Sequence, residues 1–279
     1  MKVSIVIPVY NEAERLAACL EAISLQTVEP YEVIVIDNNS SDESVRVARS
    51  FPFVTLMHQP KQGVVHTRTL GFNAARGDII GRIDADTLLP AMWVKQIQTI
   101  FVDEQISAVS GSAHYYDFPL YMVADRVDAF LRRRLARQLG DRNYLWGANM
   151  AVRRSAWQQV IPRLCEAPAI HEDFDLGIHL QELGLRVAYE PSLNAGVSSR
   201  RIDCNFADYV RYTMVSPNTY KYHGLRSRRH MYLVLSVCWL TYVPSRLLYR
   251  GYDDVTGQFS FTKAFSTTAP RVDPTSNIA

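Results

Sequence analysis

Several features that would place a protein in a specialised class are absent from this chain of 279 residues. Its four cysteines are scattered and form no C-x-x-C pair, which argues against a disulfide framework or a zinc site and favours a reducing compartment. Neither charge sign dominates, because 30 Lys and Arg face 28 Asp and Glu, and this balance argues against a dedicated nucleic-acid binder. The chain also lacks G-x-x-x-x-G-K-[ST] and G-x-G-x-x-G, the glycine-rich loops that cradle phosphates in many nucleotide-binding proteins.

No hydrophobic run is long enough to span a bilayer, which takes about 20 residues. The longest run covers residues 231–243 and ends before Pro244. It lies in a basic stretch, since residues 200–250 hold nine Lys or Arg against two Asp. Such a run forms either a core helix or an interfacial helix on anionic lipid, and the basic flanks favour the second. No signal peptide is apparent, so we expect a cytoplasmic protein, peripheral on the inner face of the cell membrane.

What the chain does contain is an ordinary globular composition, with 48% hydrophobic and 21% charged residues, and alternating strand and helix signals. Short β-branched runs predict strands at residues 3–7, 31–36, 53–57 and 79–83. Apolar residues at helical spacing predict a helix at residues 12–24 and another at residues 67–75. Between them, a further helix is predicted to start after a cap at Ser41 or Asp42. This order predicts an α/β fold with a mostly parallel sheet covered by helices.

Polar residues follow three of the predicted strands, at residues 8–12, 37–42 and 84–86. Ligands of open α/β sheets bind beyond the carboxyl ends of the strands, so we expect the three segments to meet at one edge. Alternation along an extended strand tip would turn Asp84 and Asp86 to the same side. Carboxylates gathered in this way repel one another unless a cation balances them, and oxygen ligands suit Mg²⁺ or Mn²⁺ shared with phosphate oxygens.

Taken in order, these segments resemble the family-2 glycosyltransferases, which have the GT-A fold. The three segments are similar to the family's opening turn, its second nucleotide-binding loop and its D-x-D motif. Residues 63–77 are similar to the helix before the metal-binding strand, residues 147–153 to an acceptor-side segment, and residues 171–176 to the late E-D motif. The resemblance covers about residues 3 to 190, and such an ordered set is more specific than a lone D-x-D.

The resemblance implies a role for each matching residue. The residues implied in binding a nucleotide-diphosphate sugar are Pro8, Tyr10, Asn11, Glu12, Asp37, Asn39, Arg68, Asp84, Ala85 and Asp86. Among them, Asp84 would contact the ribose, and Asp86 would bind Mn²⁺ or Mg²⁺ on the diphosphate. Asp173 would be the general base that deprotonates the acceptor hydroxyl, and Glu172 would support it or contact the acceptor.

Other residues near these motifs have both a functional and a structural interpretation. Trp146, Gly147 and Asn149 would lie on the acceptor or sugar side, although Trp146 is equally a core residue and Asn149 a turn cap. His171 could complete the metal shell, which would favour Mn²⁺, although a hydrogen-bonded structural histidine is the more common case. His223 is a weaker candidate for the same position.

Departures from the family pattern limit the prediction. Arg68 stands in Thr-Arg-Thr instead of the usual Ala-Arg-Asn, and it either faces the diphosphate or makes a salt bridge on a helix surface. The Q-x-x-R-W motif of processive synthases is reduced to one Arg in residues 208–212, so transfer of a single sugar is expected.

Residues 126–142 hold six Arg against two Asp, which is typical of a solvated helix face or of a surface for a phosphate-bearing acceptor or anionic lipid. Residues 198–201 could close over the diphosphate.

These observations predict an inverting, divalent-metal-dependent glycosyltransferase. It would move one sugar from a UDP-sugar, or from a GDP- or dTDP-sugar, to a hydroxyl or phosphate of a glycan or lipid-linked acceptor in polysaccharide or cell-envelope biosynthesis. One alternative is a nucleotide-sugar-forming nucleotidyltransferase, but the glycine-rich basic loop expected after the first strand is missing. Another is a non-catalytic nucleotide- or membrane-binding module, which the presence of Asp86 and Asp173 disfavours.

The catalytic domain is expected at residues 1–195, a basic and apolar extension at 196–261, and an irregular tail at 262–279.

Overall fold

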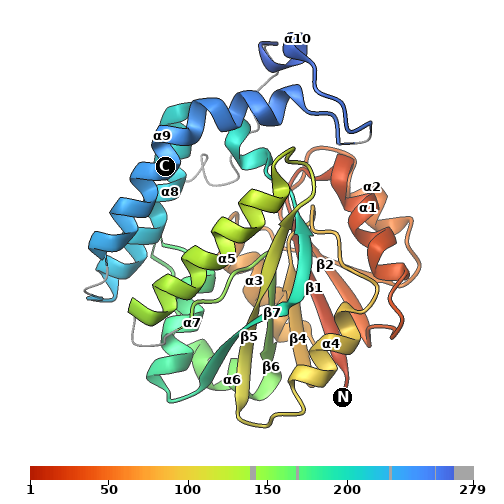
Figure 1. The fold of residues 1–279 in the computed structure, drawn as a ribbon. Coiled ribbons are helices and arrows are strands. Elements are labelled where there is room, and N and C mark those ends of the chain that lie inside the picture. Colours follow the sequence, from red (N-terminus) through yellow and green to blue (C-terminus); the bar gives the residue numbers. More distant parts are fainter. Residues whose placement is uncertain (139–142, 168–169, 226–227, 255, 267–279) are drawn as a thin grey trace.

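The protein is built on a seven-stranded sheet with the strand order β3-β2-β1-β4-β6-β5-β7 (Figure 1). The computed structural model describes residues 1–138, 143–167, 170–225, 228–254 and 256–266. The strands are β1 (Val3–Val9), β2 (Glu32–Asp37), β3 (Val54–His58), β4 (Ile79–Ile83), β5 (Ile106–Tyr115), β6 (Asn149–Arg153) and β7 (Arg186–Val197). Neighbouring strands are parallel except at β6, which runs antiparallel to β4 and β5. The predicted α/β class with a mostly parallel sheet is confirmed.

Helices cover both faces of the sheet because successive strand side chains point to opposite faces. Ile5 and Ile7 of β1 pack with α1 (Ala13–Ser24), α2 (Ser44–Arg49) and α4 (Trp93–Ile100). Val6 lies between them and packs on the other face with α3 (Val64–Ala74), α6 (Arg154–Val160) and α7 (Glu172–Glu182). A strand buried on both faces is a continuous apolar run, which explains why β1, β2 and β4 can be located in the sequence, whereas β3 is a partly exposed edge strand.

The predicted helices occur with shifts at their ends. Helix α1 buries the apolar stripe expected from its spacing, which consists of Leu16, Cys19, Leu20 and Ile23. Helix α3 begins at Val64 instead of Thr67. The predicted cap of α2 is wrong in detail, because Glu43 directly precedes the helix, while Asp42 Oδ1 accepts a hydrogen bond from the Ser44 N–H at 3.0 Å.

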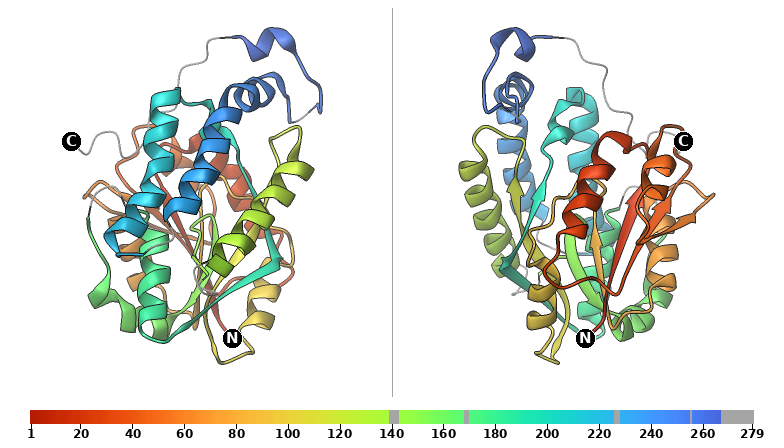
Figure 2. Two further views of the ribbon diagram at one scale, coloured as in Figure 1. Left: turned by 60° about the vertical axis from the view of Figure 1, so that its left-hand side comes forward. Right: turned by 90° about the vertical axis from the view of Figure 1, so that its right-hand side faces the viewer.

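In Figure 1 the C-terminal helices α8 (Phe206–Tyr222) and α9 (Arg228–Gly251) run along the left side of the molecule, and the short α10 (Phe261–Ala264) lies at the top. A turn of 3₁₀ helix, η2 (Arg200–Asp203), connects β7 to α8, and α5 (Tyr121–Gln138) packs against β5. Both views of Figure 2 show α8 beside α9. Part of α10 falls in the segment predicted to be an irregular tail, and residues 267–279 lie outside the described residues.

Helix α9 contains the longest apolar run and continues past Pro244. One of its faces is buried, because Met231 and Leu235 pack with residues of α7 and α8. The opposite face is exposed, with Val237, Leu240 and Val243 at 56%, 82% and 61% exposure. The run is therefore a core helix on one side and an uncovered apolar surface on the other. Among the described helices, none combines the length and apolarity needed to cross a bilayer.

Candidate functional site

The two carboxylates after β4 are carried by a tight turn. The Thr87 N–H donates to the Asp84 carbonyl oxygen at 3.0 Å, and the Asp84 N–H donates to Thr87 Oγ1 at 3.2 Å. The expected extended strand tip is therefore wrong. The turn still presents both carboxylates, because Ala85 and Thr87 take the buried positions while Asp84 and Asp86 line one cavity of about 440 Å³. This volume is within the range of small-molecule sites.

The cavity lies between the end of the sheet and the helices around it. Its walls contain both aromatic and basic side chains, among them Tyr115 of β5, Arg132 of α5, Trp146, Arg201, and Tyr209 and Tyr212 of α8. The Arg132 guanidinium lies 4.2 Å from the Trp146 ring centroid, and the Arg201 guanidinium lies 4.2 Å from that of Tyr212. Aromatic faces beside cations suit a ligand that combines sugar rings with negative charge.

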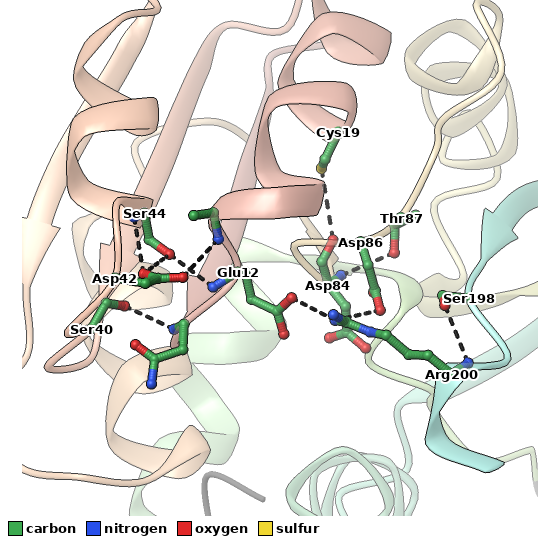
Figure 3. Close-up of polar contacts among 12 residues, drawn as sticks. Glu12, Cys19, Ser40, Asp42, Ser44, Asp84, Asp86, Thr87, Ser198 and Arg200 are labelled. Carbon is green, nitrogen blue, oxygen red and sulfur yellow. Dashed lines mark hydrogen bonds and ion pairs between the residues drawn. The ribbon is translucent and has the colours of Figure 1, made fainter. Parts of the chain in front are cut away.

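Arg200 joins the loop after β1 to the D-x-D turn. One of its terminal nitrogens, Nη2, lies 2.6 Å from Glu12 Oε2 and 2.6 Å from Asp86 Oδ2 (Figure 3). The loop that carries Arg200 is anchored to Asp117, which accepts a hydrogen bond from the Ser199 N–H at 2.7 Å. Residues 198–201, expected near the diphosphate, thus lie beside Asp86.

The loops after β1 and β2 are linked by hydrogen bonds. The Asn11 N–H donates to Ser40 Oγ at 3.0 Å, and the Glu12 N–H donates to Ser44 Oγ at 2.8 Å (Figure 3). Asn11 and Asn39 have φ values of 53° and 66°, a left-handed conformation that asparagine tolerates better than most residues. These turns fold the ends of both strands toward each other.

Asp37 ends β2 directly opposite Val9 of β1. Its side chain is buried, Oδ1 accepts a hydrogen bond from the Ser40 N–H at 3.2 Å, and Oδ2 lies 3.3 Å from His58 Nδ1. The residues predicted to bind nucleotide at the ends of β1 and β2 and in the loops that follow therefore meet at one edge of the sheet. They are Pro8, Tyr10, Asn11, Glu12, Asp37 and Asn39. Their binding role stays a prediction.

A buried arginine connects the D-x-D turn to the E-D motif. Arg82 Nη2 lies 3.2 Å from Asp84 Oδ1 and 3.2 Å from Glu172 Oε1. Burial lowers the pKa of Arg82, but the carboxylates of Asp84, Glu172 and Asp173 raise it more, so the guanidinium stays charged. The backbone at Gly147 packs directly on this group, since a Cβ there would lie 1.1 Å from Arg82 Nη1.

Asp173 is held in one orientation by backbone donors. Its Oδ2 accepts a hydrogen bond from the Gly147 N–H at 2.8 Å, and its Oδ1 accepts one from the Phe174 N–H at 2.8 Å. Glu172 and Asp173 form the first turn of α7, where the helix dipole favours negative charge. The structure thus brings together Glu172, Asp173, Gly147 and, through Arg82, the D-x-D turn.

Arg68 has a different position from either one predicted for it. Its side chain is wholly buried, and its Nη1 donates to the Glu172 carbonyl oxygen at 2.7 Å. Burial lowers the pKa of this guanidinium, and the nearby Glu172 only partly offsets the shift. This placement supports neither a diphosphate contact nor a surface salt bridge. Arg68 instead hydrogen-bonds to the backbone of the first turn of α7.

Asn149 also lies away from the cavity. Its side chain is fully buried, and Nδ2 donates to the carbonyl oxygens of Ser112 and Leu193 at 2.9 and 2.8 Å. Its Oδ1 accepts a hydrogen bond from Trp93 Nε1 at 2.9 Å. This placement supports neither predicted role, sugar binding or turn capping, because the amide ties β6 to β5 and β7.

The two histidines considered for the metal shell lie in different surroundings. The His171 ring packs 5.1 Å from Phe174 and 5.7 Å from Tyr212, measured between ring centroids. His171 forms a close group of potential ligands with Glu172 and Asp173, and among the described residues no such group of three contains Asp86. The structure therefore does not bring His171 and Asp86 into one ligand set. His223 lies 2.9 Å from Asp175 and belongs to another cluster.

The arginine-rich segment at residues 126–142 is helix α5 up to Gln138, and residues 139–142 lie outside the described residues. Arg132 faces inward and pairs with Asp128 at 2.5 Å. Arg126, Arg133 and Arg134 are exposed, on the same side of the helix as exposed apolar residues. The run is thus one buried ion pair and an outer basic face.

The turn after β4 has the chemistry to hold a hard divalent cation. Its carboxylates and that of Glu12 already attract a positive group, since Arg200 sits between Glu12 and Asp86. Oxygen donors of this kind are the ligands that Mg²⁺ and Mn²⁺ accept. The residues present therefore fit such an ion, with Asp86 as the predicted protein ligand, and do not distinguish the two metals.

Arg82 is the main residue of the site that the sequence did not reveal. The available signal was a charged residue inside the otherwise apolar strand Ile79–Ile83. A buried arginine requires a buried partner, so this position could have been linked to carboxylates beyond the strand. The identity of Glu172 as that partner could not be read from spacing.

Comparison with known proteins places the chain among enzymes of one kind. A sequence model of glycosyl transferase family 2 matches residues 4–161. Glycosyltransferase AglE of Haloferax volcanii is 29% identical over 167 residues, which cover 57% of this chain and 55% of AglE. Undecaprenyl-phosphate 4-deoxy-4-formamido-L-arabinose transferase of Pectobacterium carotovorum is 27% identical over 256 residues, 88% of this chain and 69% of that protein. The chain spans about half the length of AglE, and 34% and 40% of two other curated relatives.

Among solved structures, mannosyltransferase PcManGT from Pyrobaculum calidifontis, in complex with GDP-Man and Mn²⁺, superposes with a TM-score of 0.62. The alignment covers 88% of this chain and 73% of that chain at 19% identity. A likeness at this identity concerns the fold.

Proposed function

The chain belongs to glycosyl transferase family 2 and has the GT-A fold, and on that premise we propose that it transfers one sugar from a nucleotide-diphosphate sugar to an acceptor, with inversion at the anomeric carbon. The observation that carries the proposal is the Arg82 bridge, with 3.2 Å to Asp84 on one side and 3.2 Å to Glu172 on the other. The bridge holds Glu172, the residue directly before the candidate base Asp173, beside the turn that would hold the diphosphate.

In the proposed reaction, Asp173 takes the proton of the acceptor hydroxyl. The acceptor oxygen then forms a bond to the anomeric carbon as the bond from that carbon to the diphosphate breaks, and the nucleoside diphosphate leaves with the electron pair. In-line attack of this kind inverts the anomeric centre. The backbone donors of Gly147 and Phe174 orient the Asp173 carboxylate before substrate arrives, so little reorganisation is needed.

Charge on the leaving group is balanced from the D-x-D side. When bound at Asp86, a divalent cation supplies electrostatic stabilisation of the departing diphosphate. Arg200 and Arg201 add positive charge at the same wall of the cavity. The structural neighbour PcManGT was solved with GDP-Man and Mn²⁺, whereas the family resemblance favours a UDP-sugar donor. Both GDP-sugars and UDP-sugars therefore belong in a donor screen.

We place the acceptor on the aromatic side of the cavity and propose that it is lipid-linked. The wall there includes Trp146 and Tyr209, and the neighbouring α5 and α9 carry exposed apolar residues such as Phe130 at 60% and Leu240 at 82%. A lipid-phosphate acceptor would be reached by an enzyme peripheral on the anionic inner face of the cell membrane. The undecaprenyl-phosphate arabinose transferase among the relatives is named for such an acceptor.

The test is a donor screen with the purified chain. UDP-, GDP- and dTDP-sugars are incubated with Mn²⁺ or Mg²⁺, with and without undecaprenyl phosphate, and nucleoside diphosphate release is measured. One donor is expected to give metal-dependent release, and that donor alone is expected to raise the melting temperature. A donor that binds but gives no nucleoside diphosphate release, either with an acceptor or by hydrolysis, would favour the non-catalytic module instead.

Two variants assign the roles. Asp173→Asn is expected to lower transfer by about 10²-fold or more while donor affinity stays near that of the parent protein, because only proton transfer is lost. Asp86→Ala is expected to weaken metal-dependent donor binding in calorimetry. Asp78→Asn, an exposed carboxylate at the opposite end of the sheet, is the matched control for both. Retained turnover in Asp173→Asn would move the base elsewhere.

A further inference from the structure

Outside the catalytic carboxylates, one cluster gathers four side chains that commonly bind transition metals. Its members are Cys165, Asp175, His179 and His223, and their ligand atoms all lie within 4.8 Å of one another. Cys165 follows the 3₁₀ turn η1 (Ile161–Arg163), Asp175 and His179 belong to α7, and His223 directly follows α8. We propose that these four side chains bind one structural zinc ion.

The distances are those of a site that needs little adjustment. Asp175 Oδ1 lies 2.9 Å from His223 Nε2 and 3.4 Å from His179 Nε2. The Cys165 sulfur lies 3.6 Å from His179 Nε2. In a tetrahedral zinc site with metal–ligand distances of about 2.0 to 2.3 Å, neighbouring ligand atoms are roughly 3.3 to 3.7 Å apart. Each ligand atom would therefore move by about 1 Å or less.

The ligand atoms are aimed by their neighbours. His179 Nδ1 lies 2.8 Å from Glu182 Oε2, so a proton shared with that carboxylate leaves the lone pair of Nε2 directed into the cluster. A carboxylate behind a metal-binding histidine is the usual outer support of zinc sites. On the other side, Asp175 Oδ2 accepts a hydrogen bond from the Cys165 N–H at 3.0 Å, which leaves Oδ1 for the ion.

The charges balance for a divalent ion. A thiolate, a carboxylate and two neutral imidazoles carry two negative charges, which Zn²⁺ neutralises. Neutrality matters because the side chains of Asp175 and His223 are only 1% and 6% exposed, and unpaired charge is costly at such burial.

Zinc suits this donor set better than the ions proposed for the catalytic site. Sulfur and imidazole ligands select Zn²⁺ over Mg²⁺ and Mn²⁺, which prefer oxygen. Four protein ligands fill a tetrahedral shell and leave no open position, which is typical of structural zinc. The missing C-x-x-C pair argued against a zinc site, but this cluster needs only a single cysteine, which the fold brings together with distant histidines.

The position of the cluster gives the ion a structural purpose. All four ligands lie beyond residues 4–161, the part matched by the family model, and they join α7 to the end of α8. Helix α7 begins with Glu172 and Asp173, and α8 contributes Tyr209 and Tyr212 to the cavity wall. A zinc ion here would hold the C-terminal helices against the helix that carries the candidate base.

The test measures metal content and needs neither donor nor acceptor. The untagged full-length chain is produced in zinc-supplemented medium, dialysed against chelating resin and assayed by mass spectrometry. About one zinc per chain is expected, with loss of zinc in Cys165→Ser and His223→Gln. The matched controls Cys238→Ser and His66→Gln, partly buried residues outside the cluster, are expected to keep it, as is Asp86→Ala.

Two measurements on the parent protein keep the proposal open to refutation if a variant fails to fold. Removal of the ion with a strong zinc chelator should lower the melting temperature by several degrees, and added Zn²⁺ should restore it. Replacement by Co²⁺ should give the thiolate-to-cobalt charge-transfer absorption that requires a bound cysteine. Parent protein without zinc, unaffected in melting temperature by added Zn²⁺, would mean that the cluster is a hydrogen-bonded network only.

Discussion

At position 147 the site has no room for any side chain. A Cβ there would lie 1.1 Å from Nη1 of Arg82 and 2.1 Å from its Cζ, so the guanidinium occupies the space that alanine would need. The same backbone N–H donates to Asp173, and the same guanidinium bridges Asp84 and Glu172. A single glycine thus allows the D-x-D turn and the E-D motif to meet.

Replacement of Gly147 by alanine is expected to displace Arg82 from both carboxylates. Because this leaves buried charges without partners, the free energy of unfolding should fall by about 3 kcal/mol, and transfer should fall with it. Urea denaturation at pH 7 measures the first quantity. Gly184→Ala is the control, since nothing lies within 4 Å of its Cβ and only its φ of 75° is strained, at a cost of about 1 kcal/mol. Equal losses in the two variants would refute the special role of Gly147.

At the level of elements, α5 has two faces with different tasks. The inner face places Ala124 and Arg132 on the cavity wall. The outer face combines exposed basic and apolar side chains at helical spacing, which are Val123, Arg126, Val127, Phe130, Arg133 and Arg134. Helix α9 repeats the division, with one buried face and one exposed apolar face. Apolar residues among arginines suit the surface of an anionic membrane better than bulk water.

This division predicts binding to anionic vesicles. The chain should sediment with vesicles of phosphatidylglycerol and phosphatidylcholine, and less with phosphatidylcholine alone. Reversal of two charges in Arg133→Glu/Arg134→Glu should weaken partitioning by about 10-fold or more, because each basic residue near the surface contributes roughly 1 kcal/mol. Arg46→Glu/Arg49→Glu on α2, where both arginines are also exposed, is the control with the same change in charge. Loss of binding in that control to the same extent would point to net charge instead of the α5 face.

Over the whole molecule, the net charge of +2 averages over separate acidic and basic regions. Acidic side chains gather where the strands end. Arginines lie exposed on the outer face of α5, and Arg82 is buried between Asp84 and Glu172. Stability is likewise spread beyond the site. At the opposite end of the sheet, Glu32 accepts hydrogen bonds from Ser4 Oγ at 2.6 Å, the Arg76 N–H at 2.6 Å and Arg76 Nε at 3.1 Å.

These contacts make stability depend on pH. Burial raises the pKa of Glu32, but hydrogen bonds from Ser4 and Arg76 lower it more, so the net shift is downward. A carboxyl whose pKa is lowered by folding stabilises the fold above its usual pKa, and this contribution is lost as pH falls through the lowered value. Glu32→Gln should therefore cost about 1 to 2 kcal/mol at pH 7, and the difference should shrink below about pH 4.

Urea denaturation between pH 3 and pH 7 provides the measurement for Glu32. Glu29→Gln, which changes an exposed carboxyl in the turn before β2, should differ from the parent by less than about 0.5 kcal/mol at every pH. A difference for Glu32→Gln that persists unchanged at pH 3 would show that side-chain geometry, and not charge, is responsible.

The sequence by itself determined the first four strands, the polar segments at their ends and the order of the motifs, but not β5, β6 and β7. These features are local, because buried strands are continuous apolar runs and parallel topology brings their carboxyl ends together. Only the tertiary structure decided which polar groups pair. Arg82 with Glu172, Arg68 with the start of α7, Asn149 with two neighbouring strands and Cys165 with His179 and His223 all join distant parts of the chain. No spacing encodes such pairs, since burial selects the partner only after the backbone has folded.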